Sequence, residues 1–363
     1  MSIKELFTIL LSDKPSTLLK ENEEELFKLI PELERCKGFN QNNEWHIYDV
    51  YEHILHVVDN VPNTLVLRLA ALFHDTGKPI SYTEDENKVG HFYGHWDESK
   101  KIFDKFVGKD YFDPYIKERV SKIITYHDLN LSKLDDISIF NVQDIIELYA
   151  FKKADLLAQN EKYHYILDDY KKQKVELLSK VRDNIKNKYN EISTPEELME
   201  FMDNYILYGW IDKNGERHVN VLAGLRENFR TSSLDEMLYT GLGTCIEQAN
   251  MIKTTLERMG FETKVFCHRS YETEENFDEE VRMHCFVLYK DENDWYHFEH
   301  SNQGRKGIHK YDSVELAVDE ITRYHREHGD IRKITEIPEL PSGLSFKEFN
   351  EYVNSYDNDI KTK

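Results

Sequence analysis

The sequence predicts a multi-domain chain in which an all-α helical bundle is followed by an α+β domain. Its 363 residues exceed what one hydrophobic core usually serves, so two domains are the natural expectation. Between residues 1 and 190, apolar residues recur at steps of three and four, which is the period of amphipathic helices. After residue 194 the chain changes to short apolar and alternating runs separated by turn residues, a mixture that is typical of α+β domains.

Helical periodicity is clearest in three segments of the first domain, which we place at residues 1–190. Their apolar positions are Leu26, Leu29, Ile30 and Leu33; Val50, Ile54, Val57 and Val58; and Leu65, Leu69, Leu72 and Phe73. Residues 168–190 are rich in Lys, Asp and Glu and poor in apolar side chains. We therefore expect a solvated helix there, leading into a linker at residues 190–193.

The second domain, placed at residues 191–349, opens with a helix start. Thr194 and Glu197 have the spacing of a capping box, and the pair Asn214-Gly215 predicts a hairpin turn. A further helix is expected at residues 245–259, where a glycine follows the last apolar position. Strands are expected at residues 263–267, 284–289 and 295–298. A polar, frayed tail is expected at residues 350–363.

Composition limits the partners that the chain can have. The formal net charge of −21 repels phosphate backbones, so broad nucleic-acid binding is not expected, although a local basic patch or bound cations can still hold one phosphorylated ligand. No segment reaches the ~20 apolar residues of a membrane helix. The first residues lack the apolar stretch of a signal peptide. The four cysteines follow no zinc-binding spacing, so we expect a cytoplasmic protein with reduced thiols.

An adjacent pair of metal-ligating residues, His74 and Asp75, ends an apolar helix and is followed by a glycine turn. The imidazole and the carboxylate point to nearly the same place, and Asp75 can bridge two metals. His53 lies on the preceding helix and Asp155 on a much later one. Four such groups that converge from separate helices can bind a divalent transition metal.

Two further histidines, His95 and His127, fit a second metal ion. Two ions a few ångströms apart can clamp a phosphoryl group and generate a nucleophile at neutral pH. Histidine and carboxylate ligands suit Mn, Fe, Co, Ni or Zn, so one or two ions of unresolved identity are expected.

The first domain resembles the HD superfamily of metal-dependent phosphohydrolases, and within it the HD domain of bacterial tRNA nucleotidyltransferases. The resemblance runs from about residue 18 to residue 160 and rests on the segments IPEL (30–33), YEHIL (51–55), RLAALFHDTGKP (68–79) and FYGH (92–95). It implies metal ligation by the matching residues His53, His74, Asp75, His95, His127 and Asp155. It also implies a catalytic role for Asp75 and a contact between Lys78 and substrate phosphate. The implied activity is hydrolysis of a phosphomonoester or phosphodiester in a phosphorylated small molecule, with a nucleotide among the candidates; tRNA tailing is not implied.

Other interpretations of these histidines remain open. The set can instead be buried hydrogen-bonding groups in a helical bundle. His46 and His56 are left out of the predicted site, His56 because a solvated or core-edge role suits it better. His91 is also left out of the ligand set, with contact to substrate as its alternative role.

A candidate nucleophile, Cys245, follows the glycine-rich turn GLGTC (241–245) and opens an amphipathic helix. A helix N-terminus favours negative charge, which suits a thiolate, and its backbone N–H groups can serve an oxyanion. His284 and Glu299 lie on two later predicted strands. If those strands are adjacent, the three residues supply a nucleophile, a base and a group that orients the base.

This second set resembles the transglutaminase-like, papain-related superfamily over about residues 194–311, in the order cysteine helix, histidine strand and acid strand. The resemblance implies the nucleophile, base and orienting roles for Cys245, His284 and Glu299. Glu299 is a departure, because the family's acid is more often aspartate. His297 and His300 stay open as alternatives to His284.

Three functions therefore remain in view. The first is metal-dependent phosphoester hydrolysis by the HD domain, linked to a Cys-His-Glu domain. The second is a thiol amidohydrolase or protease regulated by nucleotide binding to the HD domain. The third is a non-enzymatic regulatory binding protein.

Overall fold

The computed structural model describes the chain except for residues 109–111, 132–133, 135, 272–279, 327–330 and 358–363. It divides into two compact units, Met1–Val181 and Arg182–Lys363. The division falls inside helix α11 (Leu167–Glu191), whereas the sequence placed the boundary after residue 190. The predicted solvated helix at 168–190 corresponds to α11, which also buries a stripe of apolar residues at Leu177, Val181, Ile185 and Tyr189.

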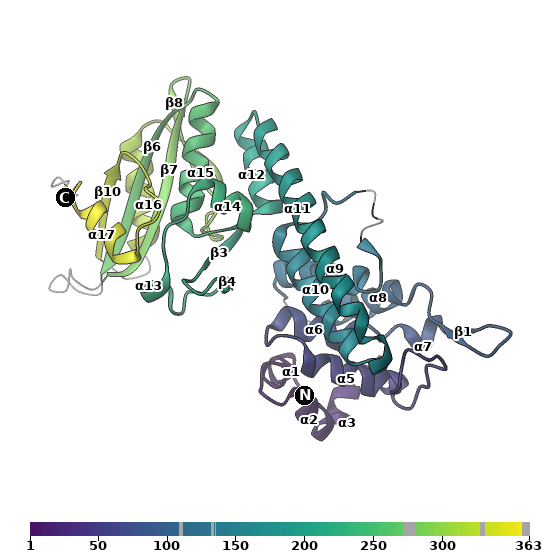
Figure 1. The fold of residues 1–363 in the computed structure, drawn as a ribbon. Coiled ribbons are helices and arrows are strands. Elements are labelled where there is room, and N and C mark those ends of the chain that lie inside the picture. The colour runs from purple at the N-terminus through teal and green to yellow at the C-terminus, as the bar shows by residue number, and fades with distance from the viewer. Residues whose placement is uncertain (109–111, 132–133, 135, 272–279, 327–330, 358–363) are drawn as a thin grey trace. The chain divides into compact units, whose positions relative to one another are not determined.

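The first unit is built mainly from helices (Figure 1). They are α1 (Ile3–Leu10), α2 (Pro15–Glu21), α3 (Glu23–Leu29), α4 (Pro31–Cys36), α5 (Val50–Asn60), α6 (Leu65–Phe73), α7 (Lys78–Ser81), α8 (His95–Val107), α9 (Pro114–Tyr126), α10 (Val142–Leu157), the 3-10 helix η2 (Glu161–Ile166) and the first part of α11. The helical character expected for residues 1–190 is therefore confirmed for most of the described part.

Helix α6 forms the centre of the first unit. Every residue of α6 after Leu65 is buried, and the helix packs against α5, α8, α9 and α10. Arg68 is its one charged residue, and a helix with so few polar side chains lies inside a bundle because it has no face suited to water. Thr64 caps its start by accepting a hydrogen bond from the backbone N–H of Leu67. The end of α6, where His74 follows, is consequently deep in the bundle.

A short hairpin that the sequence analysis did not predict lies between α7 and α8. Strands β1 (Thr83–Glu84) and β2 (Gly90–His91) pair in antiparallel fashion. Gly90 fits only because it lacks a side chain: a Cβ there would lie 2.3 Å from the backbone oxygen of Gln41. Two-residue strands give too little alternation to be recognised from sequence.

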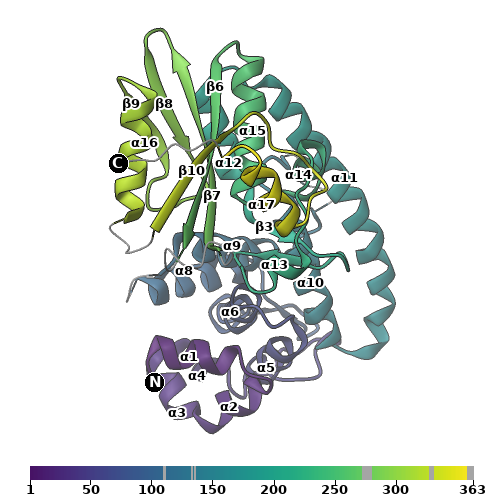
Figure 2. The same ribbon diagram turned by 90° about the vertical axis from the view of Figure 1, so that its left-hand side faces the viewer.

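The second unit combines helices with a five-stranded antiparallel sheet (Figure 2). Its further helices are α12 (Pro195–Tyr205), α13 (Leu225–Asn228), α14 (Leu234–Thr240), α15 (Cys245–Arg258), α16 (Val314–Arg326) and α17 (Phe346–Asn354). The large sheet has the order β10 (Ile331–Ile337), β6 (Glu262–Tyr271), β7 (Glu280–Asp291), β8 (Asp294–Glu299), β9 (Gly307–Tyr311). A smaller sheet has the order β4 (Arg217–Val219), β3 (Leu207–Ile211), β5 (Leu242–Gly243).

The core of the second unit lies where α16 packs on the sheet. Phe286 and Leu288 of β7 are buried in one cluster with Ala317 and Ile321 of α16. Helix α15 packs against β6 and β7. The three predicted strands and the hairpin at Asn214-Gly215 are present, while β9 and β10 were not predicted. The α+β character of this half is thus confirmed.

The C-terminal segment differs from the expectation of a frayed tail after residue 349. Helix α17 continues to Asn354 and fully buries Val353, because its apolar face packs onto the unit. Asp357 forms an ion pair with the buried Arg269 of β6 at 2.6 Å. Residues 358–363 of the predicted tail lie outside the described residues. Among the described helices, none is long and apolar enough to cross a membrane.

Candidate functional site

Four histidines of the first unit are oriented in the same way. In each, Nδ1 lies within hydrogen-bonding distance of a backbone carbonyl, which leaves Nε2 directed away from that carbonyl. The pairs are His53 with Ala158 (3.4 Å), His74 with Ala71 (2.9 Å), His95 with Phe92 (2.8 Å) and His127 with Ile124 (2.7 Å). This arrangement fixes both the ring orientation and the tautomer, as metal-ligating histidines commonly require.

The carboxylate of Asp75 lies between two pairs of these imidazoles. Its Oδ2 is 3.4 Å from Nε2 of His53 and 3.2 Å from Nε2 of His74. Its Oδ1 is 3.3 Å from Nε2 of His95 and 3.9 Å from Nε2 of His127. One carboxylate oxygen therefore faces each pair, the geometry that a bridging ligand between two ions needs.

Asp155 completes the first pair from α10. Its Oδ1 lies 2.9 Å from Nε2 of His53 and 3.9 Å from Nε2 of His74. The ligand atoms of His53, His74 and Asp75 lie within 4.8 Å of one another, and so do those of Asp75, His95 and His127. The structure thus brings together all six residues predicted as metal ligands.

Buried polar atoms at this cluster lack aligned partners within the described part of the chain. Nε2 of His53, Nε2 of His74 and both oxygens of Asp75 are close to one another but do not meet the angular requirements of hydrogen bonds. Leaving such atoms unpaired in a buried site costs free energy, so they indicate a group that the protein is built to hold. A set of imidazole nitrogens and carboxylate oxygens fits a divalent transition metal.

The charges at the cluster separate its residues into anions and neutral rings. Burial raises the pKa of Asp75, but His74 and Lys78 more than offset it and hold that pKa well below the usual range. Burial lowers the pKa of His127 well below its ordinary value, and the neighbouring His95 and His74 lower it further. Burial opposes protonation of His74, yet Asp75 and Asp155 raise its pKa overall. Ionised Asp75 and neutral His127 are the forms in which these groups bind metals.

Lys78 points into this centre. Its Nζ lies 2.7 Å from Oδ2 of Asp75 and donates a hydrogen bond of 2.8 Å to Oε1 of Gln41. Nε2 of His46 lies 3.2 Å from the same Nζ. Gln41 was not predicted and His46 was set aside, because both precede α5 in an irregular loop that carries no periodic pattern. Lys78 is placed to balance the charge of Asp75 and to face whatever occupies the centre.

A cavity of about 180 Å3 opens beside the cluster. Predicted residues that line it are Asp75, Lys78, His95, His127 and Asp155. His91 also lines it, which agrees with its alternative role as a substrate contact, and its ring stacks on that of the exposed Tyr93 at 5.4 Å. Trp96, Asp128 and Gln159 line it as well and were not predicted. His56, left out of the site, instead stacks on Tyr48.

Comparison with protein families gives the same assignment for this region. Residues 45–204 match the family model described as HD domain. Residues 45–204 are therefore similar to HD domains. HD domains bind divalent metals and are generally metal-dependent hydrolases, which supports an enzymatic activity. No curated protein matches the chain.

The second predicted site lies at the start of α15. Cys245 is the first residue of this helix, and Thr244 caps it together with Glu247 in a capping box. The buried Glu247 carboxylate accepts hydrogen bonds from the backbone N–H and the hydroxyl of Thr244, at 2.8 and 2.5 Å, and from the N–H of Ser232 at 3.0 Å. These contacts hold the turn that presents Cys245, and only Thr194 and Glu197 had been recognised as such a box from sequence.

Strands β7 and β8 place His284 and Glu299 together. Nε2 of His284 lies 2.7 Å from Oε2 of Glu299. Cys245 is close enough to His284 to raise the pKa of its imidazole, and Sγ of Cys245 lies 3.8 Å from the carbonyl oxygen of Met283. Oε1 of Glu299 accepts hydrogen bonds from Asn302 and Ser301, at 2.9 and 3.2 Å, which holds the carboxylate in place. The three residues form a chain from sulfur to imidazole to carboxylate.

The charges at these three residues favour an ion pair between His284 and Glu299. Burial opposes protonation of His284, but Glu299 and the hydrogen bond with Cys245 raise its pKa well above the ordinary value. Burial likewise raises the pKa of Glu299, and His284 more than offsets this and lowers that pKa well below its usual range. His284 is therefore positively charged and Glu299 negatively charged at neutral pH.

The two alternative histidines are placed differently. Nε2 of His297 lies 3.5 Å from Oε2 of Glu299, and burial lowers the pKa of its imidazole. His300 instead contacts Gln248 through Nδ1 at 2.8 Å and Asp203 through Nε2 at 2.9 Å. Of the three histidines, His284 is the one whose pKa the neighbouring Cys245 raises.

Proposed function

We propose that the first unit hydrolyses a phosphomonoester or phosphodiester with the help of one or two divalent metal ions. The observation that carries this proposal is the orientation of four imidazole Nε2 atoms around the two oxygens of Asp75. His53, His74, Asp75 and Asp155 would hold one ion, and His95 and His127, with Asp75 shared, would hold a second. When bound, such ions supply Lewis acidity and a nucleophile at neutral pH.

The side chains of the unit have defined tasks in this proposal. Asp75 supplies a negative charge to each half of the centre. Lys78 supplies a positive charge beside Asp75, where it can neutralise a non-bridging oxygen of a bound phosphoryl group. The backbone carbonyls that bind the Nδ1 atoms keep the four rings in place before substrate arrives, so that little reorganisation is needed.

The size of the cavity limits what can bind beside the centre. About 180 Å3 is less than the ~300–1,000 Å3 of pockets that enclose a whole drug-sized ligand, so we expect the cavity to receive the phosphoryl group and a small part of its substituent. A phosphorylated small molecule is the proposed substrate class, and a nucleotide is one member of it. The cytoplasm, where such metabolites are abundant, is the proposed location.

The test is hydrolysis of 4-nitrophenyl phosphate and bis(4-nitrophenyl) phosphate by the intact chain with Mn²⁺, Co²⁺, Ni²⁺ or Zn²⁺. His53→Ala should abolish turnover and metal retention, while His56→Ala, one turn further along the same helix, should leave both unchanged. Turnover by the chelated chain, or equal turnover by the two variants, would contradict the proposal.

We further propose that residues 191–349, within the second unit, form a transglutaminase-like thiol hydrolase domain. The specific observation in its favour is the connected arrangement of Cys245, His284 and Glu299, with His284 protonated and Glu299 ionised. A thiolate beside an imidazolium at a helix N-terminus is the usual form of an activated cysteine.

The proposed reaction is hydrolysis of an amide. Sγ of Cys245 attacks the carbonyl carbon and forms a C–S bond, the C–N bond breaks, and His284 gives its proton to the leaving amine. Water then attacks the thioester, His284 takes a proton from that water, and the acid is released as Sγ is regenerated. The backbone N–H of Cys245 belongs to the first turn of α15, where N–H groups have no partner within the helix, and it would stabilise the oxyanion.

Alkylation by iodoacetamide tests this second proposal. At mildly acidic pH, Cys245 should react faster than Cys36, because burial raises the pKa of the Cys36 thiol. His284→Ala should slow the alkylation of Cys245, whereas His309→Ala on the neighbouring strand β9 should not. Equal rates at Cys245 in the two variants would contradict a role for His284.

A further inference from the structure

A cavity of about 270 Å3 adjoins Cys245 and is not used in the reaction described above. Its wall is mostly apolar and comes from several elements of the second unit. The apolar residues are Leu222, Leu225, Phe229, Ile246, Met283 and Phe346. Cys245 itself belongs to the lining, so the reactive sulfur of the proposed hydrolase borders an apolar space.

The depth of this cavity follows from the exposure of its lining. Phe229 and Ile246 are 3% and 4% exposed and form the inner wall, while Leu222 is 63% exposed and lies at the rim. Cys245 is only 7% exposed. When the carbonyl group of a substrate reaches this sulfur, the substituent next to that carbonyl therefore lies beside the cavity or inside it. An apolar substituent is favoured there because its burial releases water from both surfaces.

The charged groups around the cavity do not favour a polar ligand. Arg226 is the charged member of the lining, and its guanidinium lies over the ring of Phe346, 5.5 Å from the centroid. Tyr208 also lines the cavity, and burial raises the pKa of its phenol, so that it stays neutral. The interior wall is therefore neutral and apolar.

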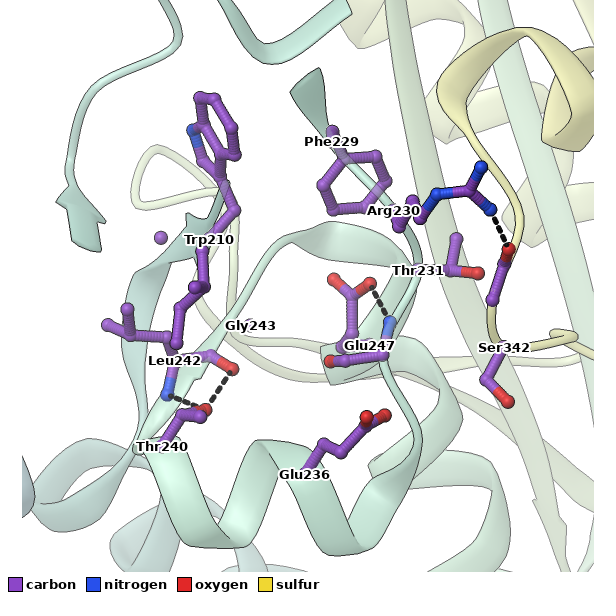
Figure 3. A pocket seen from close by; sticks show the side chains of 14 residues that line it. Trp210, Phe229, Arg230, Thr231, Glu236, Thr240, Leu242, Gly243, Glu247 and Ser342 are labelled. Carbon is purple, nitrogen blue, oxygen red and sulfur yellow. Dashed lines mark hydrogen bonds between the residues drawn. The ribbon is translucent and has the colours of Figure 1, made fainter. Parts of the chain in front are cut away.

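A larger cavity of about 450 Å3 shares Phe229 with the cavity beside Cys245 (Figure 3). It is a weaker candidate for a ligand site. Its polar side chains are already engaged. Glu247 is held by Thr244 and Ser232, Glu236 accepts from Ser233, and Arg230 donates to the carbonyl of Gly343. A ligand there would have to compete with these contacts, whereas the apolar cavity needs no such exchange.

We propose that the cavity beside Cys245 is an acyl subsite, which accepts an apolar substituent next to the carbonyl that Cys245 attacks. This inference rests on the proposed thiol hydrolase function. The substrate class that it names is an amide whose acyl part carries an unbranched or aromatic hydrocarbon group small enough to fit a cavity of about 270 Å3.

Binding tests the subsite without requiring a reactive thiol. The intact chain with Cys245→Ala is titrated with N-hexyl-dansylamide, whose fluorescence rises in apolar surroundings. Leu222→Glu places a charge at the rim of the cavity and should weaken binding at least tenfold. The matched control is Leu316→Glu on α16, which is similarly exposed at 53% and lies outside the lining, and it should change binding less than twofold.

Alkylation of the chain with Cys245 intact then links the cavity to the thiol. N-hexyl-iodoacetamide should label Cys245 at least tenfold faster than iodoacetamide does, relative to the same ratio for free cysteine, and Leu222→Glu should remove this preference. Normal labelling by iodoacetamide with no hexyl preference overturns the subsite and leaves the thiol function standing. Leu222-dependent probe binding with an inert Cys245 overturns the thiol function, and the acyl subsite with it.

Discussion

Nε2 of His53 lies 2.9 Å from Oδ1 of Asp155, although the two residues belong to helices α5 and α10, which are far apart in the chain. Both side chains are largely withdrawn from water, and α5 and α10 pack against each other. The bundle therefore has to be complete before this half of the centre exists. A change at Asp155 tests whether the contact serves metal binding or only the packing of the two helices.

Asp155→Asn should reduce metal affinity at least 10–100-fold, the loss that follows even when an outer partner of a ligand is removed. The asparagine has nearly the same shape but no negative charge, so the fold should persist. Metal content after gel filtration and Mn²⁺ titration measure the effect. Asp169→Asn, on the exposed surface of α11, serves as the control. Unchanged affinity in Asp155→Asn would show that the carboxylate only packs the helices.

Metal binding should also stabilise the first unit against heat. A ligand that binds only the folded state at 100 times its dissociation constant adds about 2.7 kcal/mol of stability. Scanning calorimetry of the intact chain with and without Mn²⁺ should show one transition moving upward and reverting with chelator. Asp75→Ala should remove the shift, because Asp75 faces both pairs of histidines. A shift of equal size in this variant would place the ion elsewhere.

The six predicted ligands lie together in the structure because each belongs to a regular element or directly follows one. His53 lies on a periodic helix, His74 and Asp75 follow a helix that is apolar except for Arg68, and Asp155 lies on a third helix. Such positions are fixed by periodicity and by the need to bury the apolar faces. The resemblance to the HD superfamily supported the assignment of the two remaining ligands, His95 and His127.

Several contacts near the centre, and one strand, could not be predicted from the sequence. Gln41 reaches Lys78 from a loop, and Lys152 donates hydrogen bonds to the backbone carbonyls of His127 and Leu129, which steadies the end of α9. A lysine on a helix is usually solvated, so nothing in the pattern distinguishes Lys152. Strand β10 was likewise missed, because its isoleucines at residues 331, 334 and 337 recur every three residues and not at the period of two that marks a half-buried strand.

Phe151 of α10 packs against two histidines of the centre. It is fully buried, and its ring centroid lies 5.2 Å from that of His74 and 5.8 Å from that of His127. Phe151→Ala should lower the free energy of unfolding by about 3–5 kcal/mol through the cavity that it leaves. Because both imidazoles lose a packing surface, metal affinity should fall as well, whereas Phe140→Ala, equally buried but away from these rings, should affect stability alone. Urea unfolding and Mn²⁺ titration separate the two effects.

The ion pair between His284 and Glu299 predicts how the reactivity of Cys245 depends on pH. Glu299 raises the pKa of His284 well above about 6.5, so the imidazolium persists through neutral pH, and the low pKa of Glu299 keeps the carboxylate ionised below about 4.5. Alkylation of Cys245 in the natural chain should therefore change little between pH 5.5 and 7.5.

Glu299→Gln removes the charge that holds this proton. Burial then dominates, the pKa of His284 falls, and the imidazole becomes neutral in the same pH range. Cys245 then loses its positively charged partner, so its reactivity at mildly acidic pH should fall. The rate at pH 5.5 should fall at least tenfold and recover as the pH rises, as measured by mass spectrometry of the alkylated chain. The control is Glu320→Gln, which removes a carboxylate on α16 that binds Arg305 and should leave the pH profile of Cys245 alkylation flat. A flat profile in Glu299→Gln as well would contradict the orienting role of Glu299.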